Sequence, residues 1–437
     1  MKLKKLSEQT IVITGATSGI GLTTARMAAE KGAKLVLIAR NEAALSELAG
    51  EIKASGGQAI YHAADVADAY ALQIAADIAN EEFGGFDTWV NNAGGSVYGR
   101  ITDVPTEDLR RLFETNVWGV VNGSKVAVGH LKNRGGALIN VGSEVSDAPV
   151  PLQGMYSASK HAVKGFTDAL RMELEADKLP ISVTLIKPTA IHTPFPENAK
   201  NYLPYEPQLP PPLYAPELVA EAILHCAENP KRDFFVGETA KLHSSMALNA
   251  PRAYEKMNEM MIDSMQNSGV PALGDRPDGL HQTNSKLKER GAKARFVLEE
   301  SLYQRAKIHP LAFGALAVGG ALALGAVLNA RSKSKETEIE KYMGKKTRRK
   351  LLSNADEEIR EHMEVVGADG ARVGTVDGVV ADQIKLTRKD SADGQHHFIL
   401  KSLVKSIEEN RVVLSQSADE IRRGFKTSGG GSLTARA

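Results

Sequence analysis

Short apolar runs alternate with helical stretches between residues 10 and 190 of the chain. The runs are rich in β-branched residues and predict strands at 10–14, 34–39, 59–62, 87–90, 137–141 and 181–186. Each run is continuously apolar, which indicates strands that are buried on both faces. Repeated strand–helix units of this kind predict an α/β fold with a doubly wound parallel sheet.

The pattern changes after residue 190. Prolines are frequent between 196 and 214, which predicts an extended, restricted loop instead of a helix. A helix over 216–228 and a strand over 233–236 follow, and this strand could close the sheet. Residues 238–300 carry a Met-rich helical pattern, so we expect a helical extension over 241–307 behind a catalytic domain of residues 1–240.

Residues 308–330 form an apolar run without Asp, Glu, Lys or Arg. About 20 such residues span a bilayer as a helix. The small residues Ala315, Gly319 and Ala323 would permit close pairing of helices in lipid. We therefore expect a transmembrane helix here, with a buried helix of a soluble domain as the alternative.

The remainder of the chain divides into three segments. Residues 331–355 are a charged linker with a basic cluster at 345–350, which is solvated or contacts anionic lipid. Gly and Asp-Gly turns punctuate β-rich stretches in 356–424, so we expect a small β domain. The Gly- and Ser-rich end, 425–437, predicts a disordered tail.

Composition narrows the classes of function. The chain has 437 residues, with 54 Lys plus Arg against 53 Asp plus Glu, which gives no electrostatic reason to expect nucleic acid. A hydrophobic content of 42% excludes global disorder. The single cysteine, Cys226, rules out an intramolecular disulfide, and its apolar helical surroundings predict a core position.

A glycine-rich turn follows the first predicted strand and opens a helix. Its residues are Thr14, Gly15, Ala16, Thr17, Ser18, Gly19, Ile20 and Gly21. Glycines let the backbone turn sharply and approach a pyrophosphate, while the helix N-terminus offers N–H groups and a favourable dipole. The position between strand and helix predicts a dinucleotide site, although a tight turn without a ligand is the alternative.

Residues at three further strand ends extend this site. Arg40 ends the second strand, where an acidic residue would bind the ribose hydroxyls of NAD, so we expect NADP(H) with its 2′-phosphate on Arg40. NAD(H) is the less favoured cofactor, and a solvated Arg40 is the alternative. Asp65 follows the third strand and could accept from the adenine amino group. The fourth strand leads into Asn91, Asn92, Ala93 and Gly94, which would line the cofactor trench.

Tyr156 and Lys160 lie one turn apart in a helical stretch and therefore share a face. A phenol with a pKa of about 10 is a poor acid–base catalyst at neutral pH, and a neighbouring ammonium favours its ionisation. Ser143, at the end of a strand, could hydrogen-bond a carbonyl, and Asn116 could hold a water linking Lys160 to solvent. A Tyr and Lys at this spacing are usually a surface pair, so the complete set carries the prediction.

This ordered set resembles the short-chain dehydrogenase/reductase family over about residues 8–240. The resemblance implies a Rossmann fold and hydride transfer between the nicotinamide and a carbonyl or alcohol substrate. It also implies that Tyr156 donates the proton, that Lys160 binds the nicotinamide ribose, and that Pro188 and Thr193 touch the cofactor. Where the family often has Pro-Gly, this chain has Pro188-Thr189. A homo-oligomer is compatible with the resemblance.

The C-terminal segment resembles a small bacterial domain of unknown function that is similar in appearance to the photosynthetic-reaction-centre barrel. The matching stretches are 362–367, 374–377 and 395–398. The resemblance implies a β-barrel and no activity. His396 and His397 are adjacent, and adjacent residues of a strand point to opposite faces, so we assign no metal site.

The leading hypothesis is an NADP(H)-dependent alcohol or ketone oxidoreductase attached to a membrane, with an apolar substrate plausible there. The alternative is a membrane scaffold whose reductase fold only senses NADP(H). The charge pattern conflicts with a single span, because the positive-inside rule places 331–350 in the cytoplasm and NADP(H) supply places the reductase there too. A segment that dips in without crossing would reconcile them. We expect the reductase to face the cytoplasm at a bacterial inner membrane.

Overall fold

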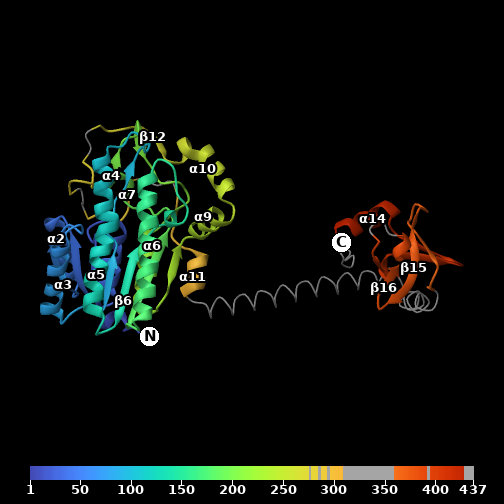
Figure 1. Ribbon diagram of the computed structural model, residues 1–437, viewed down its shortest axis with the longest axis horizontal. Helices are drawn as coiled ribbons and strands as arrows, with labels where there is room; N and C mark the ends of the chain where they lie inside the picture. The colour runs from blue at the N-terminus through green and yellow to red at the C-terminus, as the bar shows by residue number, and fades with distance from the viewer. Residues whose placement is uncertain (275–276, 284–286, 293–295, 309–358, 391–393, 428–437) are drawn as a thin grey trace. The chain divides into compact units, whose positions relative to one another are not determined.

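A computed structural model of the chain describes residues 1–274, 277–283, 287–292, 296–308, 359–390 and 394–427 (Figure 1). Its contacts divide the chain into two compact units, Met1–Leu316 and Ala317–Ala437. The first unit holds the predicted strand–helix repeats and the second holds the predicted small β domain. Each unit is described by itself.

The first unit is built on a seven-stranded sheet with the order β11-β7-β6-β4-β1-β2-β3, in which every neighbouring pair is parallel. The strands are β1 (Thr10–Thr14), β2 (Lys34–Ala39), β3 (Gln58–Ala63), β4 (Thr88–Asn91), β6 (Gly136–Val141), β7 (Ile181–Pro188) and β11 (Asp233–Val236). The predicted doubly wound parallel sheet is therefore confirmed, and β11 closes one edge of it.

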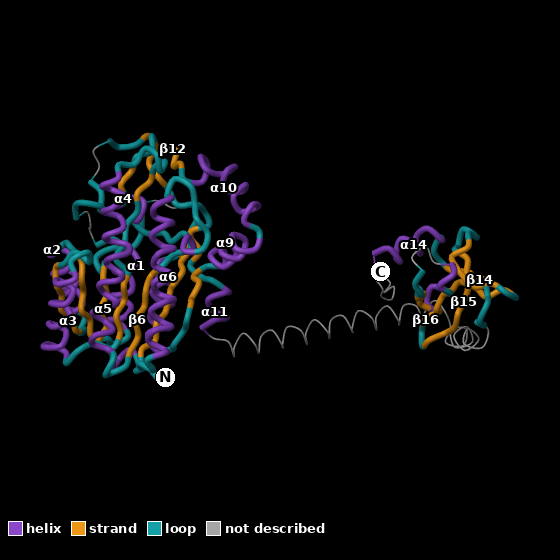
Figure 2. Tube along the Cα trace, in the orientation of Figure 1, coloured by secondary structure: helices purple, strands orange, loops and turns teal. Residues whose placement is uncertain are grey.

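Helices cover both faces of this sheet (Figure 2). They are α1 (Gly19–Glu30), α2 (Glu42–Ala54) and α8 (Pro216–Glu228) on one face, and α3 (Ala69–Phe83), α5 (Gly119–Leu131) and α6 (Gly154–Ala176) on the other. Alternate residues of β1 serve the two cores, since Ile11 and Ile13 join the first cluster and Val12 joins the second. Burial on both faces explains why the strands read as continuous apolar runs.

The strand order reverses between β1 and β4. From β1 the chain proceeds outward through β2 and β3, then returns to β4 and proceeds through β6 to β7 on the other side. Loops that leave the carboxyl ends of β1 and β4 therefore diverge, which opens a crevice at this edge of the sheet. The glycine-rich turn and the loop after Asn91 both lie at that edge.

The loop after β7 is mostly extended, as its prolines predict. It contains the short strands β8 (Lys200–Asn201), β9 (Tyr205–Pro207) and β10 (Leu213–Tyr214), but it begins with one helical turn, α7 (Phe195–Asn198). The helices α9 (Glu238–Asn249) and α10 (Pro251–Met265) then pack against each other, with α9 beside β11 (Figure 1).

The predicted helical extension over 241–307 is wrong for the described residues between Gln266 and Ser301. The described residues continue as β12 (Asn267–Pro271), an irregular stretch and β13 (Val297–Leu298), before α11 (Leu302–Ile308). Gly269 adopts a φ of +75°, and Pro271 and Gly274 follow it, so the local sequence disfavours a helix at this point. Gly279, Leu280 and Thr283 of the irregular stretch lie at the crevice.

No helix among the described residues is long and apolar enough to cross a membrane. The expected transmembrane run at 308–330 lies outside the described residues, apart from Ile308 at the end of α11. The charged linker at 331–355 also lies outside them. Both therefore remain predictions from sequence.

The second unit contains a six-stranded sheet with the order β17-β16-β15-β14-β19-β18. Its strands are β14 (Glu364–Val366), β15 (Arg372–Val380), β16 (Gln383–Leu386), β17 (Phe398–Leu400), β18 (Val404–Glu408) and β19 (Arg411–Leu414). The predicted β domain is confirmed, although the pairing among these described strands leaves β17 and β18 as edges. Helix α14 (Ala418–Thr427) corrects the predicted start of a disordered tail at 425, because Ile421 and the half-buried Phe425 pack on the core.

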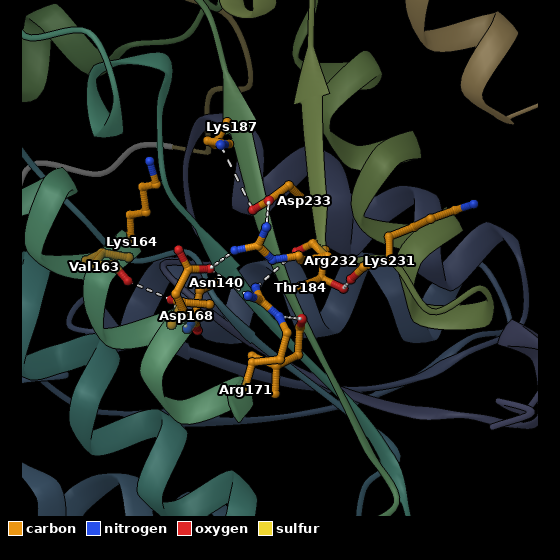
Figure 3. A network of polar contacts seen from close by, with 12 residues as sticks. Asn140, Val163, Lys164, Asp168, Arg171, Thr184, Lys187, Lys231, Arg232 and Asp233 are labelled. Atoms are coloured by element: carbon orange, nitrogen blue, oxygen red, sulfur yellow. Dashed lines mark hydrogen bonds and ion pairs between the residues drawn. The ribbon is translucent and has the colours of Figure 1, made fainter. Parts of the chain in front are cut away.

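Helix α6, which carries Tyr156 and Lys160, is attached to the sheet by a buried arginine (Figure 3). Arg171 donates from Nε to the Val183 carbonyl of β7 at 2.9 Å, and from Nη2 to the Arg232 carbonyl before β11 at 3.1 Å. Arg171 also pairs with Asp168 at 2.6 Å. Partial burial would raise the pKa of the Asp168 carboxyl, but Arg171 and the exposed Arg232 lower it overall. One guanidinium thus links a helix, strand β7 and the residue that precedes β11.

We expect Arg171→Met to lower the free energy of unfolding of the first unit by about 2–4 kcal/mol, because two carbonyls lose a donor and Asp168 loses a buried partner. Both tryptophans, Trp89 and Trp118, lie in this unit, so their fluorescence in urea reports it in the full chain. Arg232→Met is the matched control, since its side chain is 66% exposed, and should cost less than about 1 kcal/mol. Equal losses in the two variants would contradict the assigned role.

Candidate active site

A cavity of about 310 Å³ occupies the crevice at the carboxyl ends of the strands. Residues from the loops after β1, β2, β3, β4, β6 and β7 line it, among them Gly15, Arg40, Asp65, Ala93, Ser143 and Pro188. The cavity reaches from Arg40 and Asp65 to Tyr156 and Lys160. It therefore brings most of the predicted cofactor residues and three of the four predicted catalytic residues into one site, whereas Thr14, Gly21, Asn91 and Asn116 do not line it.

The glycine-rich turn has the geometry that its sequence predicts. Gly15 and Gly19 have φ values of +66° and +51°, in the left-handed region that favours glycine. A Cβ atom on Gly21 would lie 2.2 Å from the Gly15 carbonyl oxygen, so no larger residue fits. Thr17, Ser18, Gly19 and Ile20 line the cavity at the N-terminus of α1. This cradle fits a pyrophosphate, whose charge the helix dipole would favour.

Thr14 supports the turn from behind. Its hydroxyl donates to the Val90 carbonyl at 3.3 Å and accepts from the backbone N–H groups of Asn92 and Ala93 at 2.9 and 3.0 Å. Asn92 returns a hydrogen bond from Nδ2 to the Thr14 carbonyl at 2.9 Å. Thr14 is buried and positions the cavity wall without lining it.

Asn91 differs from the prediction, because its side chain faces the interior. Its Nδ2 donates to Asn140 Oδ1 at 2.9 Å, and its Oδ1 accepts from Trp89 Nε1 at 2.7 Å. The cavity is lined by Asn92, Ala93 and Gly94 instead. Asn91 ends β4, and the alternation of side chains along a strand directs it toward α5 and β6.

The two residues predicted for the adenosine end also line the cavity, and both have protein partners. Arg40 donates to the backbone carbonyls of Leu280 and Gln282 at 3.2 and 3.1 Å, and to that of Gly279. Asp65 pairs with Arg111 of α4 (Thr106–Phe113) and accepts from the Ala67 N–H at 3.0 Å. Burial and the nearby Arg111 lower the pKa of Arg40, while Asp65 opposes this shift.

Ser143, Tyr156 and Lys160 meet at the other end of the cavity. Burial raises the pKa of Tyr156 to about 12, a hydrogen bond with Ser143 opposes this shift, and the Glu144 charge reinforces it. Burial lowers the pKa of Lys160 to about 8. The Lys160 ammonium donates to the Val141 carbonyl at 2.8 Å and lies 5.8 Å from the centre of the Tyr156 ring.

Asn116 lies beside this group but outside the cavity lining. It occupies a π-helical turn, η2 (Glu114–Trp118), and is fully buried. Its Oδ1 accepts from the Gly95 N–H at 2.9 Å, and its Nδ2 donates to the Gly95 carbonyl and to Ser159 Oγ, each at 3.0 Å. The amide thus fixes the loop after β4 to helix α6, and the water that it was expected to hold for Lys160 stays a prediction.

The substrate side of the cavity uses residues that the motifs did not predict. Phe195 packs on the Tyr156 ring with their centres 5.4 Å apart, and Leu209 and Pro210 line the cavity from the same loop. Gln266, at the end of α10, and Glu144, beside Ser143, also line it. The proline-rich loop from Thr193 to Tyr214, which we expected to cover the substrate, is the sequence signal for Phe195, Leu209 and Pro210, and the adjacency to Ser143 is the signal for Glu144. Gln266 approaches from a distant segment and has no such signal.

The remaining predicted residues lie as expected. Pro188 ends β7 and lines the cavity with Thr189, the residue at which the family often has glycine. Thr193 is buried and lines the cavity against the glycine-rich turn. A Cβ atom added to Gly19 would lie only 3.1 Å from the Cβ atom of Thr193, so the two segments are in close contact.

Comparison with known proteins agrees with these observations. The sequence profile described as short chain dehydrogenase matches residues 9–202, and an uncharacterized protein family conserved in bacteria (DUF2171) matches residues 359–422. The uncharacterized oxidoreductase YxnA of Bacillus subtilis is 44% identical over 322 residues, which cover 73% of this chain and 90% of that protein. A Bos taurus dehydrogenase/reductase, SDR family member 7B, is 38% identical over 43% of this chain and 60% of its own length.

Among solved structures, L-sorbose reductase from Gluconobacter frateurii, complexed with NADPH and L-sorbose, is 26% identical, with a TM-score of 0.47 over 54% of this chain and 96% of that one. The PRC-barrel-like resemblance of the second unit is not confirmed, since only the uncharacterized bacterial family matches it. The glycine-rich turn, the parallel sheet, the Ser143–Tyr156–Lys160 group and the long match to YxnA together show that the chain belongs to the short-chain dehydrogenase family of oxidoreductases.

Proposed function

We propose that the chain is an NADP(H)-dependent oxidoreductase that interconverts a carbonyl compound and its alcohol, with Tyr156 as the general acid and base. One observation carries the proposal: a single cavity holds the glycine-rich turn and Arg40 at one end, and Ser143, Tyr156 and Lys160 at the other. The bound nicotinamide cofactor would supply or accept the hydride.

Ser143 and Tyr156 suit the recognition of a carbonyl oxygen. Both residues line the cavity, and Ser143 is near enough to Tyr156 to lower its pKa against the effect of burial, so an oxygen placed between their hydroxyl groups could accept from both. As hydride reaches the carbonyl carbon, Tyr156 transfers its phenolic proton to this oxygen, which completes the alcohol. The reverse reaction returns the proton to Tyr156.

The protonation states place a proton on both groups near neutral pH. A Tyr156 pKa of about 12 keeps the phenol protonated, but it makes the phenol a weaker acid, which is opposite to the lowering expected from Lys160, because burial dominates. A Lys160 pKa of about 8 leaves most of the ammonium charged at pH 7. Because both groups are shielded from water, this charge stabilises the phenolate that forms when the proton leaves.

Arg40 supports NADP(H) over NAD(H). It stands at the end of β2 on the cavity wall, where it replaces the acidic residue that binds the ribose 2′-hydroxyl of NAD. A guanidinium can form charge-assisted hydrogen bonds with a 2′-phosphate. Its present partners are neutral carbonyls, so its positive charge is not cancelled by them.

The shape of the substrate side favours a partly apolar compound. Phe195, Leu209 and Pro210 supply apolar surface next to Tyr156, and Gln266 adds a polar group. Attachment to a cytoplasmic membrane face through residues 308–330 remains part of the proposal and rests on the sequence alone. A scaffold that only senses NADP(H) has no need of a buried Tyr156–Lys160 pair, and turnover distinguishes the two functions.

We expect Tyr156→Phe to lower kcat/KM for NADPH-dependent reduction by about 10²–10⁴-fold on a panel of aldehydes and ketones, because the proton donor is removed. The Kd for NADPH should stay within about twofold, since the ring remains. Tyr70→Phe is the matched control, with a side chain in α3 that is 74% exposed, and should leave both values unchanged. Equal turnover in the two variants would favour the sensor function.

The rate of reduction should depend on pH through Lys160. The reaction needs a protonated Tyr156 and a charged Lys160, and Lys160 has the lower pKa, about 8. We therefore expect kcat/KM to be level below about pH 7 and to fall as the pH rises through 8, by up to tenfold per pH unit. Initial rates between pH 6 and 10 at saturating NADPH measure this, and a rate that rises through pH 8 would contradict it.

Removal of the Arg40 guanidinium should weaken the binding of NADPH much more than the binding of NADH. We expect Arg40→Ala to raise the Kd for NADPH by about tenfold or more, because a charge-assisted hydrogen bond contributes roughly 1.5–3 kcal/mol. The Kd for NADH should change by less than about threefold, since NADH lacks the 2′-phosphate. Fluorescence titration of both cofactors gives the ratio, and a proportional change in both would exclude this contact.

A further inference from the structure

An irregular segment of the extension covers the cofactor end of the cavity. We call its two described stretches, 277–283 and 287–292, the strap. Gly279, Leu280 and Thr283 of the first stretch line the same cavity as Arg40 and Asp65. The strap follows α10 in sequence and lies outside the profile match at residues 9–202, so the family motifs do not account for it.

The first stretch joins two arginines through backbone carbonyls. The Leu280 carbonyl accepts from Arg40 Nη1 and from Arg111 Nε, each at 3.2 Å. Arg40 Nη2 also donates to the carbonyls of Gly279 and Gln282. Two guanidinium groups therefore stand close together with two carboxylates near them: Asp65, which pairs with Arg111, and Asp278, which pairs with Lys200. This cluster has a net positive charge on the cavity wall, which suits the 2′-phosphate of NADP(H).

The second stretch lies at the entrance to the glycine-rich turn. The Lys288 carbonyl accepts from the Gly19 N–H at 2.9 Å and from Ser18 Oγ at 3.5 Å, and Ser18 and Lys288 form a parallel bridge. The strap thus contacts the N-terminus of α1, where a pyrophosphate would bind. It reaches both the phosphate cradle and the 2′-phosphate position.

Side chains hold the strap to the rest of the first unit. Leu280 is 5% exposed and packs with Val97, Val104 and Leu112. The ion pairs are Asp278–Lys200 at 3.1 Å, Glu289–Arg26 at 3.0 Å and Arg290–Glu217 at 2.9 Å, and a hydrogen bond joins His281 and Asp108 at 2.6 Å. An apolar anchor with ion pairs along the stretch indicates a defined docked position.

We propose that the strap is a built part of the cofactor site, which positions Arg40 and Arg111 for the 2′-phosphate and encloses the adenosine half of NADP(H). The inference rests on the proposed function, because it presumes that the cavity binds a nicotinamide cofactor. Cofactor entry and release then require the strap to leave Gly19 and Arg40. A pyrophosphate in the cradle would replace the Lys288 carbonyl on the Gly19 N–H, so over bound NADP(H) the strap docks through Leu280 and its ion pairs. In that position it slows dissociation of the cofactor and strengthens the discrimination against NAD(H).

Substitution of Leu280 tests the role of the strap most directly, because its side chain is the apolar anchor. We expect Leu280→Ala to raise the Kd for NADPH about tenfold, mainly through a faster off-rate, because truncation of a buried leucine removes the apolar anchor. The Kd for NADH should rise less, since NADH makes no use of the Arg40 and Arg111 cluster. Stopped-flow release and equilibrium titration of NADPH and NADH on the full chain measure these constants.

Leu248→Ala is the matched control, since Leu248 lies on α9 with 80% of its surface exposed. It should bind both cofactors as the unaltered chain does. Trp fluorescence in urea checks that each variant is folded. If a folded Leu280→Ala chain binds and releases NADPH like Leu248→Ala, the inference is overturned. If the unaltered chain binds neither cofactor, the proposed function fails and the strap inference fails with it.

Hydrogen exchange tests the same idea in the unaltered chain. With NADPH bound, peptides that contain 278–283 and 287–292 should exchange at least several-fold more slowly, together with the peptide of the glycine-rich turn. NADH should protect the strap less than NADPH does. Protection of the glycine-rich turn by NADPH without any change in the strap peptides would show that the cofactor binds and the strap takes no part.

Discussion

The site depends on the hydrogen bonds that the buried Thr14 hydroxyl makes across the switch point of the sheet. Strands β1 and β4 are neighbours, but their following loops diverge, so nothing in the sheet itself fixes the distance between those loops. Thr14 supplies this link, because its oxygen accepts from Asn92 and Ala93 while it donates to Val90. The glycine-rich turn and the loop after β4 therefore form one rigid wall of the cavity.

Asn116 connects this wall to the other end of the cavity. Its side-chain amide is hydrogen-bonded to the N–H and the carbonyl of Gly95 and also to Ser159 in α6, the helix that carries Tyr156 and Lys160. The positions of the catalytic side chains relative to the phosphate cradle are thus set by buried hydrogen bonds, which hold geometry more strictly than apolar packing does. Arg171 fixes the far end of α6 to β7 and to the chain before β11.

The sequence allowed the sheet to be predicted almost completely, and the site in part. Parallel strands buried on both faces give continuous apolar runs, and this signal located β1 and β2 at their observed bounds. Tyr156 and Lys160 could be predicted because they share one helix. The orientation of the Asn91 side chain could not be predicted. Side chains alternate between the two faces of a strand, and the sequence does not show which face the last residue of β4 presents to the cavity. The strap could not be predicted either, because irregular backbone held by distant side chains has no periodicity.

The strap changes the interpretation of Arg40, which the sequence presents as a single residue. In the structure its guanidinium is oriented by the carbonyls of the strap and accompanied by Arg111, which itself bonds to Leu280 and Asp65. Carbonyl partners orient a guanidinium without cancelling its charge, whereas a carboxylate partner would compete with a phosphate. Asp65 is bonded to Arg111, so the uncompensated positive charge belongs to the pair of arginines. Discrimination between phosphorylated and unphosphorylated cofactors would then be a property of the docked strap and the arginines together.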